Sequence, residues 1–127
     1  TALEADERML PTGRTHPVTG PGEDFLAARA IGAQVVDGCF TDLERDGDGR
    51  ARVRVEGADG RAVVLWCDGA YHFLQVFTGD TLAPALRRRG LAVEPMTCPA
   101  DAFRTGTGLL TLASGARFKG RWGLTLE

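Results

Sequence analysis

The sequence predicts an all-β protein built mostly from antiparallel strands, either a β-sandwich or part of one. Three observations support this fold class: a strictly alternating segment at 50–56, turn signals at steady intervals from residue 35 onward, and almost no helical periodicity. The chain has 127 residues, the size of one domain. We therefore interpret 1–127 as part of a single β-sandwich domain, with its strands in 35–127.

Residues 1–34 are expected to form an irregular segment at the start of the chain. Turn signals are too dense there for regular structure, and they lie at 12–13, 16–17 and 19–22. A short apolar or helical element is predicted only at 24–31, where Asp24 could cap the residues that follow it. Such a long irregular stretch is unusual in a compact domain, so it suggests a connector across the surface of something larger.

The rest of the chain is predicted to be short strands joined by turns. In 50–56, Ala51, Val53 and Val55 face one side and the charged residues face the other, as in a half-buried antiparallel strand. A hairpin turn at 57–60 leads to its partner strand. The other strands are expected at 61–67, 72–78, 91–94, 109–112 and 118–126, with turns at 68–69, 87–90 and 114–115.

The composition is that of a soluble globular protein, with 43% apolar residues, 25% charged residues and a net charge of −2. The arginine triplet at 87–89 has no interleaved aromatic residues, so we interpret it as a solvated turn and expect no nucleic-acid partner. No apolar run approaches the ~20 residues of a membrane span, and no membrane association is expected. Three scattered cysteines predict free thiols in the cytoplasm.

Several kinds of chemistry lack their sequence requirements. Residues 42–49 resemble the start of an EF-hand loop, but the twelfth position is Val53 where a bidentate glutamate is needed, so a tight turn is predicted. His16 and His72 lie near neither a cysteine nor each other, so no metal site is expected. Ser114 is the only serine and lies in a Ser-Gly turn, and no glycine-rich turn follows a strand and opens a helix. Metal, nucleotide and hydrolase chemistry are therefore not expected, and no cofactor is predicted.

Glu94 is the first candidate for a functional side chain. It is followed by Pro95, which lacks a backbone donor and biases the residue before it toward extended geometry, so the strand is expected to end at Glu94. The proline-punctuated loop 95–99 would then fix an acid at the end of an apolar strand, which is one way to hold a catalytic carboxylate. A solvated glutamate at the end of a strand is the alternative.

Asp37 and Gln75 are the other two candidates. Asp37 lies between apolar neighbours where the strands begin, and a turn or capping role is its alternative. The period of two places Gln75 on the strand face that carries Phe73 and Phe77. A glutamine beside aromatic rings suits a sugar hydroxyl, but it also suits an ordinary solvent-facing position.

These segments together resemble the bacterial aldose 1-epimerases, or galactose mutarotases. The resemblance runs from about Pro11 to the end of the chain, and its motifs lie at 37–40, 74–80 (Leu-Gln-Val-Phe-Thr-Gly-Asp), 93–106 (beginning Val-Glu-Pro-Met-Thr-Cys-Pro) and 122–123 (Trp-Gly). It implies a galactose mutarotase-like β-supersandwich. It also implies an isomerase that interconverts the α and β anomers of a monosaccharide of the glucose or galactose class.

The resemblance implies a role for each candidate: Glu94 as the catalytic base, and Asp37 and Gln75 as ligands of sugar hydroxyls. The reaction removes the proton of the C1 hydroxyl while the ring oxygen gains one, so a carboxylate and a matched acid suffice. Two features depart from the family pattern. Gly38 stands where many relatives have histidine, and His16-Pro17 is followed by Val18, unlike the His-Pro-Tyr-like segment of the family's acid. The acid is therefore not assigned to His16.

Family members are more than twice as long as this chain, which begins with Thr1. We therefore expect the C-terminal portion of an epimerase, with the acid supplied by an N-terminal portion. Exposed strand edges and apolar faces would then favour self-association or binding of that complementary portion. Two other hypotheses are a non-catalytic carbohydrate-binding β-sandwich and an epimerase-like protein for a phosphorylated sugar, for which Arg104 is the only arginine beside the motif.

Overall fold

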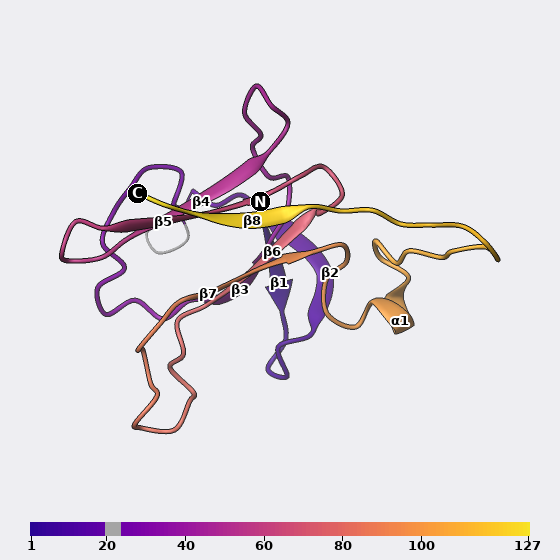
Figure 1. Cartoon of the computed structure of the whole chain (residues 1–127). Helices are drawn as coiled ribbons and strands as arrows, with labels where there is room; N and C mark the ends of the chain where they lie inside the picture. The colour runs from indigo at the N-terminus through magenta and orange to yellow at the C-terminus, as the bar shows by residue number, and fades with distance from the viewer. Residues whose placement is uncertain (20–23) are drawn as a thin grey trace.

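The structure, a computed structural model, describes residues 1–19 and 24–127. In these ranges the chain forms two antiparallel sheets and one short helix, α1 (Ala102–Thr105). Figure 1 shows the strands of the two sheets in two layers and a long irregular stretch between α1 and the last strand. The prediction of a mostly antiparallel β fold with almost no helix is confirmed.

The larger sheet has five strands in the order β2-β1-β3-β6-β7. Their bounds are β1 (Ala2–Ala5), β2 (Pro11–His16), β3 (Asp37–Phe40), β6 (Phe73–Phe77) and β7 (Ala92–Met96). Strand β6 pairs with β3 on one side and with the edge strand β7 on the other. In this register Gln75 lies opposite Cys39 on β3 and opposite Glu94 on β7.

The smaller sheet has the order β4-β5-β8, formed by β4 (Ala51–Glu56), β5 (Ala62–Cys67) and β8 (Trp122–Leu126). The alternation predicted for β4 is observed, because the residue facing the core at its start is buried and every second side chain is exposed. The predicted hairpin turn is also present. Gly60, with φ of 77°, donates its N–H to the carbonyl oxygen of Gly57 at 3.0 Å.

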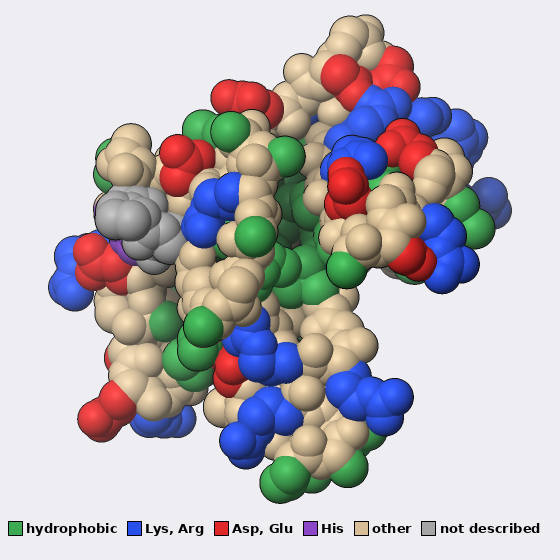
Figure 2. All heavy atoms as spheres, turned by 90° about the vertical axis from the view of Figure 1, so that its left-hand side faces the viewer, with side chains coloured by type: hydrophobic (Ala, Val, Ile, Leu, Met, Phe, Trp, Pro, Cys, Tyr) green, Lys and Arg blue, Asp and Glu red, His purple; other side chains and the backbone are tan. Residues whose placement is uncertain are grey.

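The hydrophobic core lies between the sheets, where Leu65 and Cys67 of β5 pack with Leu74 of β6. Toward β8 this core is incomplete. Trp122, Leu124 and Leu126 share a face with the inner residues of β5, yet they are 54%, 61% and 82% exposed. Figure 2 likewise shows apolar side chains at the bottom of a hollow in the face turned to the viewer.

The expectation that 1–34 is irregular is wrong for residues 2–5 and 11–16, which form the hairpin β1–β2. The sequence pattern does not reveal these strands because backbone pairing, rather than an apolar alternation, defines them. The carboxylate of Asp6 organises their turn, accepting the N–H groups of Arg8 and Leu10 at 2.9 Å each. The helical element considered at 24–31 does not form; Asp24 instead accepts the N–H of Leu26 at 3.0 Å. The turn expected at 19–22 lies mostly outside the described residues.

Three strand predictions near the C-terminus also need correction. The strand carrying Glu94 does not stop there but continues through Pro95 to Met96, because β7 is an edge strand of its sheet and an edge tolerates a missing N–H. Residues 109–112 form no strand, since no neighbouring strand pairs with them in the described chain. The final strand begins at Trp122 rather than at residue 118.

The turn predicted in place of an EF-hand is present, with the Asp46 carboxylate accepting the N–H of Arg50 at 3.1 Å.

Candidate functional site

The three sequence-predicted site residues lie on adjacent strands of the larger sheet. Asp37 begins β3, Gln75 is central in β6, and Glu94 is central in β7. Gln75 and Glu94 form a directly opposed pair, whose Cβ atoms are about 4.5–5.5 Å apart in such a ladder. Asp37 is two residues from Cys39, the other partner of Gln75, so all three side chains are on one face.

This face is the outer one, directed away from the hydrophobic core. Leu74, the neighbour of Gln75 on β6, is buried in the core at 6% exposure, and Val93, the neighbour of Glu94, packs against the same core. Successive residues of a strand alternate between faces, so Gln75 and Glu94 are turned away from the smaller sheet. Polar side chains can therefore gather on this face without entering the core.

A hydrogen bond joins two of the candidates: Gln75 Nε2 donates to Asp37 Oδ1 at 2.9 Å. The bond orients the amide and leaves Gln75 its second N–H and its carbonyl oxygen for a ligand. Asp37 is exposed and keeps its second carboxylate oxygen as an acceptor. Glu94 is also exposed, so its carboxylate is accessible to a molecule that lies across the sheet.

Asp37 and Gln75 line an open hollow of about 650 Å³, a volume within the range of small-molecule sites. The hollow extends from Gln75 over β3 toward β1 and β2, and His16 of β2 also borders it. Glu94 lies beside Gln75 on the strand next to this hollow. The arrangement can bind the hydroxyl groups of a small polar ligand, and the Glu94 carboxylate lies one strand beyond the residues that line the hollow.

Cys39 is a residue of this face that the sequence reasoning did not select. Its side chain lies on the face of Asp37 and opposite Gln75, it borders the hollow, and it is 8% exposed. Burial raises the pKa of the Cys39 thiol to about 11, so it is a neutral, weakly reactive group near neutral pH. The period of two in 37–40 would have placed it on this face.

For the other kinds of site considered from the sequence, the part of the chain that the structure describes shows the following. There, no group of three or more histidine, cysteine or acidic side chains is placed to hold a metal ion. No helix among the described residues is long and apolar enough to cross a membrane. Arg104, the arginine beside the Glu94 motif, is paired with Asp101, with Nε donating to Oδ2 at 2.6 Å.

These features define a class: a mostly β protein with antiparallel sheets and an open, ligand-sized hollow on an outer sheet face. The model of the family described as aldose 1-epimerase matches residues 1–125. The chain belongs to the aldose 1-epimerase family, and its two antiparallel sheets are consistent with the galactose mutarotase-like β fold.

One curated protein is also similar to this chain. The chain is similar to the uncharacterized protein YihR of Escherichia coli (strain K12), with 34% identity over 110 residues. The match covers 87% of this chain and 32% of YihR, so the chain spans about a third of the length of this relative. No solved structure matches the chain.

Proposed function

We propose that this chain carries the catalytic base and part of the sugar-binding site of an aldose 1-epimerase that acts on hexoses of the glucose or galactose class. The observation that best supports the proposal is the common face of Asp37, Gln75 and Glu94 on three adjacent strands. Membership of the family supplies the reaction class. The exposed carboxylate beside a hydrogen-bonding amide supplies the chemistry that this class needs.

In the proposed reaction, the Glu94 carboxylate accepts the proton of the C1 hydroxyl while a general acid protonates the ring oxygen. The bond between C1 and the ring oxygen then breaks, and the open-chain aldehyde rotates about its C1–C2 bond. Reversal of the proton transfers closes the ring as either anomer and restores both groups. Asp37 and Gln75 fix the ring through its hydroxyls, using the donor and acceptors that their mutual bond leaves available.

The general acid is proposed to come from a complementary N-terminal portion. This chain corresponds to 32% of YihR, which leaves most of a family-length protein to supply it. The exposed apolar residues of β8 support either association with that portion or self-association. A cytoplasmic location is proposed from the three free cysteines, Cys39, Cys67 and Cys98.

Polarimetry of α-glucose and α-galactose tests the proposal on the complete gene product. Glu94→Gln keeps the size of the side chain and removes the base, so we expect the rate above the spontaneous one to fall by about 10²–10⁴-fold. Glu44→Gln is the matched control, because Glu44 is exposed in the loop before β4 and does not line the hollow. An undiminished rate in Glu94→Gln would exclude Glu94 as the base.

A carbohydrate-binding protein without catalysis is the second candidate, because the hydrogen-bonded Asp37–Gln75 pair borders the hollow on its own. Calorimetry distinguishes the two. Sugar binding that depends on Gln75, with no mutarotation by the complete gene product, would favour the binding protein over the epimerase.

A further inference from the structure

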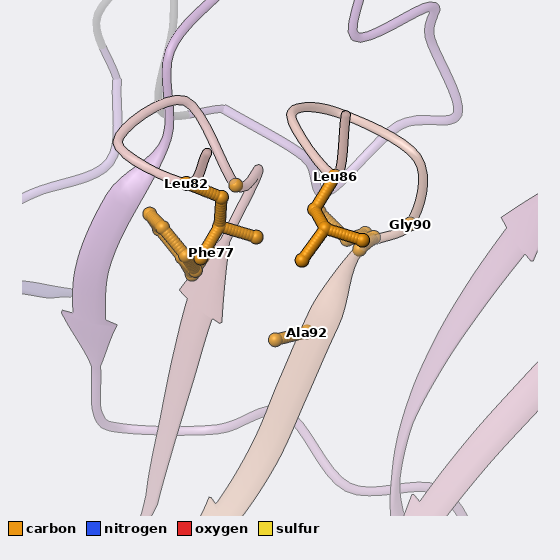
Figure 3. A pocket seen from close by; sticks show the side chains of 7 residues that line it. Phe77, Leu82, Leu86, Gly90 and Ala92 are labelled. Atoms are coloured by element: carbon orange, nitrogen blue, oxygen red, sulfur yellow. The ribbon is translucent and has the colours of Figure 1, made fainter. Parts of the chain in front are cut away.

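The loop between β6 and β7, residues 78–91, is fastened to the site face by apolar contacts. Figure 3 shows Leu82 and Leu86 pointing from the loop toward Phe77 and Ala92 around a small pocket of about 290 Å³. Phe77 and Ala92 are an opposed pair on the face of Gln75 and Glu94. The loop is thus packed over one end of the candidate site.

Hydrogen bonds from polar side chains connect the loop 78–91 to the segment that precedes Asp37. Arg88 Nη1 donates to Asp80 Oδ1 at 2.8 Å and to the carbonyl oxygen of Gln34 at 3.0 Å, and its Nη2 donates to the carbonyl oxygen of Gly32 at 2.6 Å. The sequence predicts a solvated turn for the arginine triplet at 87–89, but the Arg88 side chain is only 30% exposed. One guanidinium therefore joins the loop to residues 32–34.

Thr78 completes this connection at the residue next to Asp37. Its backbone N–H donates to the carbonyl oxygen of Val36 at 2.9 Å, and its Oγ1 lies 3.0 Å from the Val36 nitrogen. The hydroxyl also contacts Asp80 Oδ2. Oγ1 accepts the Val36 N–H, and its single proton has two acceptors within reach, the Asp80 carboxylate and the Val36 carbonyl oxygen at 3.0 Å. Thr78 is 4% exposed, which protects these bonds from water.

Hydrogen bonds hold the pKa of Asp80 below its ordinary value, with the larger effect from the Thr78 hydroxyl and the next from Arg88. The carboxylate therefore stays ionised as an acceptor between the two donors. We name Thr78, Asp80 and Arg88 the polar bridge. It binds the backbone on the N-terminal side of Asp37 at three residues, Gly32, Gln34 and Val36.

We propose that the polar bridge positions Asp37 for its hydrogen bond to Gln75 and thereby sets the affinity of the site for a sugar. The three residues act through Asp37 and are positioning residues; the sugar-affinity part of the inference rests on the proposed function. Thr78 follows the last residue of β6 and is three residues from Gln75, so the alternation of the strand places its side chain on the opposite face. Its influence must therefore pass through Val36 to Asp37.

Two substitutions test the bridge on the chain as it exists. Thr78→Val is nearly isosteric and removes the hydroxyl, whereas Thr78→Ser keeps it. Arg88→Lys keeps the charge and removes the planar fork that reaches three acceptors. Arg89→Lys is its matched control on a neighbouring exposed residue.

The first measurement is the rate at which the Gln75 side-chain amide protons exchange with water in NMR spectra. We expect a several-fold increase in Thr78→Val and Arg88→Lys, and values within twofold of the native chain in Thr78→Ser and Arg89→Lys. A purely structural role would lower the stability of the fold without changing this exchange in the folded state. Unchanged exchange in folded Thr78→Val or Arg88→Lys would overturn the inference; Arg88→Lys decides it if Thr78→Val does not fold.

The second measurement is the binding of glucose and galactose by calorimetry. Loss of one positioned hydrogen bond should weaken binding about tenfold in Thr78→Val, with recovery in Thr78→Ser. If the native chain binds neither sugar while the amide exchange still responds, the positioning of Asp37 stands and the proposed function fails. If sugar binds and the substitutions change neither the exchange nor the affinity, the proposed function stands and the bridge is excluded.

Discussion

Replacing Leu74 and Gln75 by alanine, one at a time, tests whether β6 separates the core from the candidate site. The two residues are neighbours in sequence but lie on opposite faces of the larger sheet. Leu74 is 6% exposed and packs with Leu65 and Cys67, whereas Gln75 is half-buried and bonded to Asp37. The backbone pairing of β6 is the same in both variants, so any difference reports the two faces.

The expected losses of stability differ severalfold between Leu74→Ala and Gln75→Ala. Leucine-to-alanine changes in a core reduce stability by about 2–5 kcal/mol, and we expect about 3 kcal/mol for Leu74 because the core is incomplete near β8 and can relax. Gln75→Ala removes one hydrogen bond in a half-exposed place, so about 0.5–1 kcal/mol is expected. For sugar affinity we expect the opposite: the larger effect comes from Gln75→Ala. Gln75→Ala should weaken it about tenfold, while Leu74→Ala should leave it unchanged in the folded fraction.

Urea unfolding followed by tryptophan fluorescence measures the loss of stability, and calorimetry measures the loss of sugar affinity. Leu74→Met is a control that keeps the volume and should lose less than about 1.5 kcal/mol. The unfolding curves should be repeated at several protein concentrations, because association would shift the midpoint. A loss below about 1 kcal/mol for Leu74→Ala, or equal losses for both alanine variants, would refute the separation of the two faces.

Three further outcomes follow from the structure. Gly123→Ala should destabilise the fold by about 1–3 kcal/mol and shift tryptophan emission, because a Cβ there would lie 2.8 Å from Cζ2 of Trp66; Gly47→Ala, which meets nothing within 4 Å, should do neither in the same unfolding assay. Alkylation of Cys39 by iodoacetamide should be slow at pH 8 and should accelerate as the pH approaches its pKa of about 11; rates like those of a free cysteine peptide at pH 8 would contradict its burial. The lowered pKa of Asp80 stabilises the fold fully above the ordinary carboxyl pKa of about 3.9, and this contribution is lost as the pH falls through the lower folded-state pKa. Asp80→Asn should therefore lose less stability on acidification than the native chain in unfolding curves between pH 6 and pH 3, and an equal loss would exclude Asp80 as the source.

The local sequence pattern was sufficient to predict a strand and its facing side chains where residue alternation and turn residues agree. The segment 50–56 and its glycine turn predict the β4–β5 hairpin, and the period of two places Gln75 opposite to Leu74 correctly. The meeting of Asp37, Gln75 and Glu94 could not be worked out from spacing. It depends on the order β3-β6-β7, which joins residues 38 and 19 positions apart through pairing that no local rule encodes.

Three features that the sequence did not predict correctly have physical explanations. Strands β1 and β2 form through a turn organised by Asp6, which carries no apolar signal, so density of turn residues was a misleading guide. The apolar run at 109–112 has the composition of a strand but has no neighbour to pair with in the described chain. Arg88 looked solvated because its acceptors at residues 32 and 34 are distant in sequence.

Two of the edge strands, β7 and β8, differ in their capacity to pair with an added strand. β7 contains Pro95, whose ring interrupts the row of donors that an added strand would require, whereas Trp122–Leu126 keeps an N–H at every position. Of these two edges, β8 is therefore the one at which we expect a second copy or a complementary polypeptide to add a strand. The margin next to Glu94 on β7 should stay open to solutes.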